Sequence, residues 1–198
     1  AWGKDENGQD AAYGVCYSGI PRSDNGLESG MNNTCLVKTY DGINYSLVCK
    51  LPFAPEEAAN ETAPLFLPDG RLALWVRREK LDGHGHWGVS SAPYTDWSFK
   101  DMGMRLGGPY LCNLDESTII ACSRSYNMKT SYRTVLMTCG AEGDFHEVCF
   151  LPSGGEAGDT AYAGMIKVGD ELWVSYYSRK GAKKPSIYLA RMPLSMFH

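Results

Sequence analysis

Residues 67–77 read LPDGRLALWVR, and a near-copy of this stretch, LDESTIIACSR, occupies residues 114–124. In both copies a tight polar turn leads into a short β-prone run, and the run ends in an arginine, Arg77 or Arg124. A third copy, VGDELWVSYY at residues 168–177, places a tyrosine at the equivalent position. Repeated β-units of this kind predict a radial fold in which cationic and phenolic side chains converge on an anionic ligand.

The whole chain divides into four larger units of about 45 to 55 residues, each with several short β-prone runs. This spacing is typical of propeller blades. Asp41-Gly42, between two alternating apolar runs, is the strongest hairpin signal. No stretch keeps a 3.6-residue apolar period, so helix should be scarce. We predict an all-β fold, a partial or truncated β-propeller with about four visible blades in one domain, residues 1–198. The blades are expected approximately at residues 10–53, 60–103, 106–153 and 158–194. A β-sandwich is the alternative, although it does not require one motif to recur at one period.

The composition is that of an ordinary globular protein, with 43% apolar residues, 12% aromatic residues and a net charge of −4. This charge argues against nucleic acid or an anionic membrane as the main partner, because such binders carry a basic face. No apolar run approaches the roughly 20 residues that span a bilayer. The chain opens at Ala1 without an initiator methionine, so we expect a mature, trimmed or truncated form.

The seven cysteines are odd in number, and no pair has the Cys-x-x-Cys spacing of a zinc or redox site. They lie in apolar β-like runs, so we expect free, buried thiols and favour a cytoplasmic location, with export as the alternative. His84 and His86 lie in a glycine-rich turn without further ligands nearby in the sequence, so no metal and no other cofactor is expected. Trp75 and Trp173 are expected to be core residues between blades.

Several motifs occur in an order that is shared with a known family. They are Asn60-Glu61 before residues 67–70, Arg77-Arg78, residues 93–97, residues 107–109 with residues 124–126, residues 151–155, and residues 159–164 with residues 172–178. On these motifs, which cover most of residues 10–194, the chain resembles the sialidase (neuraminidase) superfamily of β-propellers. It resembles more closely the C-terminal part of uncharacterised bacterial sialidase-like proteins.

Two departures from the family pattern matter for function. Propellers of the family have six blades, or five in some relatives, whereas about four are visible in this sequence. The family's Asp-box survives only in eroded form, around Asp41-Gly42 and residues 94–97.

The resemblance implies an arginine cluster that binds the carboxylate of a sialic acid, and Arg77 and Arg124 match two of its three members. An arginine fork suits this task because it forms paired, charge-assisted hydrogen bonds and keeps its charge near neutral pH. The alternative is that both are surface arginines at strand ends. Asp159, Tyr126 and Tyr177 are further candidates for lining the pocket or orienting the arginines, and one of Tyr176 and Tyr177 must point outward if the strand alternates.

The resemblance also implies that Tyr162 is the nucleophile and that Glu61 is the carboxylate that activates it. A neutral phenol meets less charge repulsion at an anionic anomeric centre than a carboxylate would, and sialidases use a tyrosine nucleophile. A free phenol has a pKa of about 10, so a nearby base must take its proton. The alternatives are a half-buried strand tyrosine and an exposed loop acid.

The predicted site is incomplete, because the family's general-acid aspartate and first arginine have no counterpart in the chain. Three explanations are open: the chain is a fragment of a longer enzyme, it pairs with another copy or chain to close the propeller, or it is a degenerate binding relative. An open arc of blades exposes a sheet face at each end, which favours a homo-oligomer or missing N-terminal blades.

The leading functional hypothesis is a sialidase-like glycoside hydrolase, or a C-terminal piece of one, acting on sialic acid or another anionic sugar. The second hypothesis is a non-catalytic carbohydrate-binding or assembly propeller, in which aromatic side chains stack on sugar faces. A third is a related five-bladed glycosidase with paired carboxylates, for which Glu61 and Asp159 are the obvious pair.

Overall fold

The structure is a computed structural model that describes residues 1–21, 27–126, 132–153, 160–179 and 184–198. Its regular elements are fifteen β-strands and two short 3-10 helices, η1 (Pro55–Glu57) and η2 (Leu194–Phe197). The strands form four antiparallel sheets in which chain neighbours are also sheet neighbours, as in propeller blades. The all-β fold class is therefore confirmed. The chain divides into two compact units, Ala1–Met104 and Arg105–His198.

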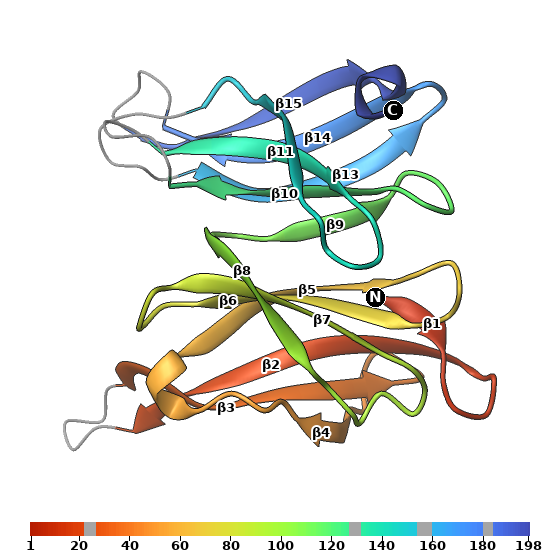
Figure 1. Ribbon diagram of the computed structural model, residues 1–198, viewed down its shortest axis with the longest axis vertical. Helices are drawn as coiled ribbons and strands as arrows, with labels where there is room; N and C mark the ends of the chain where they lie inside the picture. Colours follow the sequence, from red (N-terminus) through yellow and green to blue (C-terminus); the bar gives the residue numbers. More distant parts are fainter. Residues whose placement is uncertain (22–26, 127–131, 154–159, 180–183) are drawn as a thin grey trace. The chain divides into compact units, whose positions relative to one another are not determined.

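The first unit contains two four-stranded sheets (Figure 1). The strands of the first sheet are β1 (Trp2–Lys4), β2 (Asp10–Pro21), β3 (Leu27–Thr39) and β4 (Ser46–Lys50). Those of the second are β5 (Ala59–Phe66), β6 (Leu72–Arg78), β7 (His84–Ser90) and β8 (Phe99–Arg105). Strand β1 pairs with β2 and adds an edge strand ahead of residue 10, where the sequence analysis begins the first blade.

The core of the first unit lies between its two sheets. Alternate residues of β2, Ala11 and Tyr13, are buried with Leu72, Leu74 and Val76 of β6. Each buried side chain of leucine size contributes roughly 1.5–3 kcal/mol relative to an exposed one. The alternate residues of β2 and β6 that face one another therefore form the apolar layer between the two sheets.

Part of the eroded Asp-box also belongs to this core. Tyr94 is buried, and its hydroxyl oxygen lies 2.8 Å from the carbonyl oxygen of Lys4 and 3.1 Å from that of Gly70. Trp97 donates its indole N–H to the carbonyl oxygen of Tyr94 at 2.9 Å. Residues 94–97 therefore fasten a loop to two other segments of the unit.

The second unit contains one four-stranded and one three-stranded sheet. The strands of the first are β9 (Tyr110–Asn113), β10 (Ile119–Ser125), β11 (Arg133–Cys139) and β12 (His146–Phe150). Those of the second are β13 (Thr160–Val168), β14 (Glu171–Ser178) and β15 (Ser186–Pro193). Their shared core includes Ile120 and Leu136 from one sheet and Leu172 and Val174 from the other.

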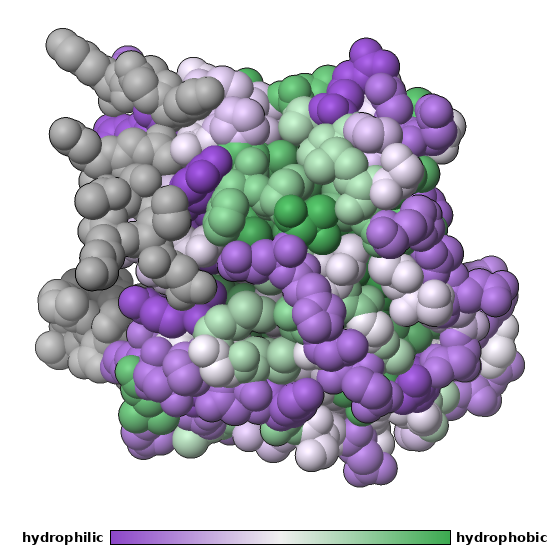
Figure 2. Space-filling model, turned by 45° about the horizontal axis from the view of Figure 1, so that its top comes forward, coloured by the Kyte–Doolittle hydropathy of each residue, from purple (hydrophilic) through white to green (hydrophobic). Residues whose placement is uncertain are grey.

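The opposite face of the three-stranded sheet is exposed. Register pairs Tyr177 with Ile187 and Ser175 with Leu189, so these residues share one face, and Ile187 and Leu189 are 83% and 58% exposed. Figure 2 shows apolar residues reaching the surface among polar ones. The expectation that another copy or chain covers an exposed blade face stays a prediction.

The second strands of three sheets are built alike. Strands β6 and β10 have the same burial pattern, in which Arg77 and Arg124 are the half-buried residues next to the strand end. Tyr177 is half-buried at the corresponding place in β14, whereas Tyr176 beside it is buried. The predicted equivalence of the three strand positions is confirmed. Trp75 is fully buried as expected, but the prediction for Trp173 was wrong: it is only half-buried, with Arg191 stacked on its ring.

All seven cysteines are free thiols, but only Cys122 and Cys139 are fully buried and Cys16 is exposed. Burial raises the pKa of Cys139 to about 12, which makes this thiol unreactive. The thiol of Cys16, on β2, is exposed and departs from the expectation of buried thiols.

Aspartates close the tight turns between strands. The carboxylate of Asp115 accepts the backbone N–H groups of Ser117 and Thr118, each at 2.8 Å, and the hydroxyl of Ser117 at 3.0 Å. These hydrogen bonds lower the pKa of Asp115 to about 2. The turn before β10 therefore depends on an ionised side chain.

We predict that acid weakens this turn. A carboxylate with a lowered folded-state pKa contributes stability that is present above its unfolded pKa of about 3.9 and is lost as the pH falls through about 2. Asp115→Ala should lower the melting temperature at neutral pH and flatten its fall between about pH 4 and pH 2, as measured by circular dichroism. Asp96→Ala, at an exposed position, is the control. An unchanged pH profile in Asp115→Ala would contradict this role.

Candidate functional site

Arg124 is the centre of a polar cluster in the second unit. Its backbone N–H donates to the carbonyl oxygen of Gly107 at 2.8 Å, and its side-chain Nε donates to the carbonyl oxygen of Thr160 at 2.8 Å. Its two terminal nitrogens, Nη1 and Nη2, each lie 3.4 Å from a phenol oxygen, that of Tyr126 and that of Tyr177. The guanidinium is thus held at one nitrogen by the backbone and framed at the other two by hydroxyl groups.

Tyr162 lies beside this cluster on an irregular part of β13. A β-bulge interrupts the pairing of β13 with β14 between Ala161 and Gly164, and Ala161 and Tyr162 have φ angles of 117° and 49°. Positive φ costs of order 1–3 kcal/mol per non-glycine residue, so the surrounding structure must impose it. Tyr162 is 51% exposed, and its ring stacks on Tyr177 with centroids 5.9 Å apart.

Two glycines make room for these side chains. A Cβ atom at Gly107 would lie 2.6 Å from the hydroxyl oxygen of Tyr126 and 3.1 Å from Cβ of Arg124. A Cβ atom at Gly108 would lie 2.8 Å from the backbone nitrogen of Tyr162 and 3.1 Å from its ring. Both glycines are therefore closely packed against the cluster, and at Gly108 the nearest atom belongs to the backbone.

The structure thus brings four of the predicted residues together in the second unit: Arg124, Tyr126, Tyr177 and Tyr162. Tyr126 also lies under the guanidinium of Arg105, whose Cζ is 4.8 Å from the ring centroid. Asp159, a further candidate from the sequence, lies outside the described residues.

Arg77 and Glu61 belong to the first unit and form a different kind of cluster. Nη1 of Arg77 lies 2.6 Å from Oε2 of Glu61, and Nη2 lies 2.5 Å from Oε1 of Glu79. Glu61 occupies a β-bulge between Ala59 and Thr62, and its backbone N–H is bonded to the side chain of Asn60 at 2.6 Å. Both terminal nitrogens of Arg77 are therefore engaged by carboxylates of the chain itself. The cluster of Arg77, Glu61 and Glu79 carries two negative charges and one positive charge.

Sequence reasoning missed Glu79 and Thr160. Glu79 follows Arg77 by two positions, and in extended chain such residues point to the same side, so an ion pair could have been inferred. The sequence analysis named Thr160 only as part of a motif. Its carbonyl oxygen meets Arg124, 36 positions away, only because the sheets of β13 and β10 pack together.

An open groove of about 520 Å³ lies elsewhere in the first unit. Its lining comprises Lys50, Pro52, Val89, Thr95, Asp96, Trp97 and Ser98. The Trp97 ring stacks on Phe99 with an interplanar angle of 13°, which holds one aromatic wall in place.

No protein-family model matches the chain, and no curated protein matches its sequence. Solved structures do match. A protein of unknown function from Dyadobacter fermentans DSM 18053 is 15% identical with a TM-score of 0.74, covering 98% of this chain and 52% of its own. The exo-beta-1,3-galactanase of Phanerochaete chrysosporium, solved with beta-1,3-galactotriose, is 12% identical with a TM-score of 0.59 and the same coverage. The Trypanosoma rangeli sialidase bound to the inhibitor DANA is 13% identical with a TM-score of 0.64, covering 95% of this chain and 30% of its own.

These likenesses establish the fold. The chain has the β-propeller fold of sialidase and of other glycosidases, with four sheets as visible blades, and the predicted sialidase-like β-propeller is confirmed. The chain spans about half the length of the first two of these structures. Among the described residues, no helix has the length and apolar character needed to cross a membrane.

We predict that Gly108→Ala destabilises the protein more than Gly169→Ala. Both glycines have positive φ, +57° and +61°, so both variants carry a similar backbone strain. Only at Gly108 does the added methyl group meet Tyr162, whereas nothing lies within 4 Å at Gly169. The difference in unfolding free energy should be about 1–3 kcal/mol in urea denaturation. Equal losses in the two variants would contradict the close packing of Tyr162 on Gly108.

Proposed function

We propose that this chain recognises the carboxylate of an acidic sugar, such as a sialic acid, through Arg124, as part of a sialidase-like glycosidase. The observation that supports this most is the framing of the Arg124 guanidinium. One nitrogen is fixed by the Thr160 carbonyl, and the other two face phenol oxygens at 3.4 Å, a long separation for a hydrogen bond.

A carboxylate suits this frame chemically. Its two oxygens accept from Nη1 and Nη2 as a bidentate pair, and the hydroxyl groups of Tyr126 and Tyr177 donate to the same oxygens. Charge-assisted bonds of this kind are shorter and stronger than the contacts to neutral phenol oxygens that they would displace. The exposed ring of Tyr162, stacked on Tyr177, would then border the bound sugar.

Arg77 is a weaker candidate for the same task. A sugar carboxylate would have to displace Glu61 or Glu79 from its terminal nitrogens, against the repulsion of both acids. We assign Arg77 instead to holding the Glu61 carboxylate in place. In this proposal the Tyr162 phenol oxygen, after losing its proton to water, displaces the leaving oxygen from the anomeric carbon; the leaving oxygen takes a proton from water, and a second water then releases the sugar from Tyr162.

We predict that Arg124→Lys weakens binding of N-acetylneuraminic acid by roughly 10- to 100-fold in isothermal titration calorimetry, because lysine keeps the charge but loses the paired hydrogen bonds. Arg71→Lys is the matched control, since Arg71 is a half-buried arginine like Arg124 but pairs with Asp69 in a turn. It should bind as the unmodified chain does. Absence of binding to the unmodified chain, or equal affinity in Arg124→Lys, would contradict the proposed recognition.

The second candidate function is non-catalytic carbohydrate binding. It is favoured by the open groove beside Trp97, whose stacked indole offers an apolar wall for a sugar face. Two of the similar structures, an exo-beta-1,3-galactanase and an alpha-L-arabinofuranosidase, are enzymes named for neutral sugars. This likeness supports a neutral sugar as the ligand of the groove.

Turnover separates the two functions. We predict that the chain releases the fluorophore from a fluorescent sialoside and that Tyr162→Phe, which lacks the nucleophilic oxygen, loses at least about 100-fold in kcat. Fluorescent galactosides and arabinofuranosides are the comparison substrates. Binding without any product between about pH 4 and pH 8 would favour the binding protein, and faster turnover of a neutral sugar would overturn the carboxylate-directed reaction.

A further inference from the structure

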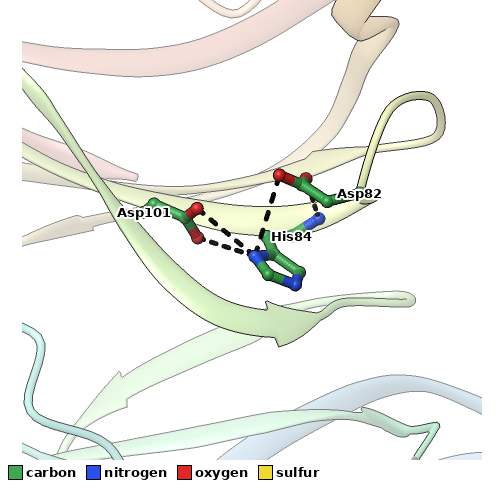
Figure 3. Close-up of side chains that lie close together, drawn as sticks. All are labelled: Asp82, His84 and Asp101. Carbon is green, nitrogen blue, oxygen red and sulfur yellow. Dashed lines mark hydrogen bonds and ion pairs between the residues drawn. The ribbon is translucent and has the colours of Figure 1, made fainter.

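Three metal-ligating side chains meet at one end of the second sheet of the first unit. Asp82 lies in the loop after β6, His84 is the first residue of β7, and Asp101 lies on the neighbouring strand β8. In Figure 3 the Nδ1 atom of His84 lies between the two carboxylates. Sequence analysis found no partner for this histidine because Asp101 is 17 positions away and becomes a neighbour only through strand pairing.

The distances within this Asp82–His84–Asp101 cluster are those of a shared ligand shell. Nδ1 of His84 lies 3.1 Å and 3.3 Å from the two oxygens of Asp101, and 3.8 Å from Oδ2 of Asp82. The three ligand atoms lie within 4.8 Å of one another. Ligands at about 2.0–2.2 Å from a tetrahedral ion are themselves roughly 3.3–3.6 Å apart, so small side-chain rotations would complete the shell.

The three side chains are held in position by other groups. Oδ1 of Asp82 accepts the backbone N–H of His84 at 2.8 Å and also pairs with Arg78, which leaves Oδ2 turned toward the histidine ring. Arg78 is buried, and its Nε donates to the carbonyl oxygen of His84 at 2.9 Å. Both backbone groups of His84 are thereby fixed. Such outer contacts orient ligands in known metal sites.

Asp101 is held in a similar way. Its Oδ1 accepts the backbone N–H of Gly103 at 2.8 Å, which fixes this oxygen beside the His84 ring. Asp82, Asp101 and Glu57, which pairs with Arg78 at 3.0 Å, carry three negative charges against the single positive charge of Arg78.

We propose that Asp82, His84 and Asp101 bind a divalent transition-metal ion of the Zn²⁺ type. One imidazole nitrogen with two carboxylates is a donor set that suits zinc and its first-row neighbours, whereas calcium and magnesium prefer oxygen ligands alone. Water completes the coordination, since the three side chains are 33% to 49% exposed. With Nδ1 of His84 as the ligand, Nε2 would be the ring nitrogen that carries the proton.

A metal ion at this place would join two strands. Asp101 belongs to β8, the edge strand of its sheet, while His84 begins β7. Binding that requires both strands in their folded positions stabilises the folded chain and should raise its melting temperature.

The test is a titration of the full chain with Zn²⁺ by isothermal titration calorimetry, and with Co²⁺ by visible absorption. Both are performed in a Cys16→Ser background, because an exposed thiol also binds zinc. The variants are His84→Gln and Asp101→Asn; the latter keeps an oxygen to accept the Gly103 N–H and so preserves the turn. The matched controls are His146→Gln and Asp10→Asn, at exposed positions on other strands.

We expect one Zn²⁺ per chain, a higher melting temperature with zinc, and affinity weakened roughly 10- to 100-fold or more in each of the two variants but not in the controls. The Co²⁺ spectrum should lack a thiolate charge-transfer band. No saturable binding, a thiolate band, or equal affinity in Asp101→Asn and the unmodified chain would overturn the site.

Discussion

The contacts made by Thr160 hold the candidate site of the second unit together. Its side chain is buried on β13, and its hydroxyl donates to the carbonyl oxygen of Tyr177 at 2.9 Å. Because that hydroxyl has only one proton, the Thr134 hydroxyl, 2.6 Å away on β11, must be the donor in the contact between the two threonines. The backbone carbonyl oxygen of Thr160 accepts a hydrogen bond from Nε of Arg124. One buried residue thus ties three strands from two sheets to the guanidinium, and the strained backbone of Tyr162 follows two positions later.

Two arginines in equivalent strand positions have acquired different surroundings. Arg77 lies between the carboxylates of Glu61 and Glu79, whereas Arg124 is bonded to a carbonyl oxygen and faces phenol oxygens. A repeat fixes where a side chain emerges from a blade, because that depends on strand length and register. It does not fix the partners of the side chain, because those come from neighbouring strands and loops that differ between repeats. The proposed recognition of a sugar carboxylate is accordingly centred on Arg124 and not on Arg77.

The sequence was sufficient to predict the sheets and the equivalence of Arg77, Arg124 and Tyr177, because both follow from turn residues and alternation along single strands. It was insufficient for Trp173, since a propeller motif does not tell which face of its sheet another blade covers. The positive φ angles of Ala161 and Tyr162 carry no signal in residue type, because glycine is the residue expected there. Asp101 and His84 likewise become neighbours only through the pairing of β7 and β8.

The interpretation of Arg124 as the group that recognises a sugar carboxylate can be examined on its own guanidinium group, at the Nε–H that adjoins the two terminal nitrogens. The nitrogen–proton resonance of its Nε–H, assigned by its loss in Arg124→Lys, would be followed by NMR during titration with N-acetylneuraminic acid and, separately, with its methyl ester. The ester keeps the sugar but removes the negative charge. We predict a saturable shift of this resonance with the acid and little or none with the ester. Equal shifts with both compounds, or no shift with either, would contradict the interpretation.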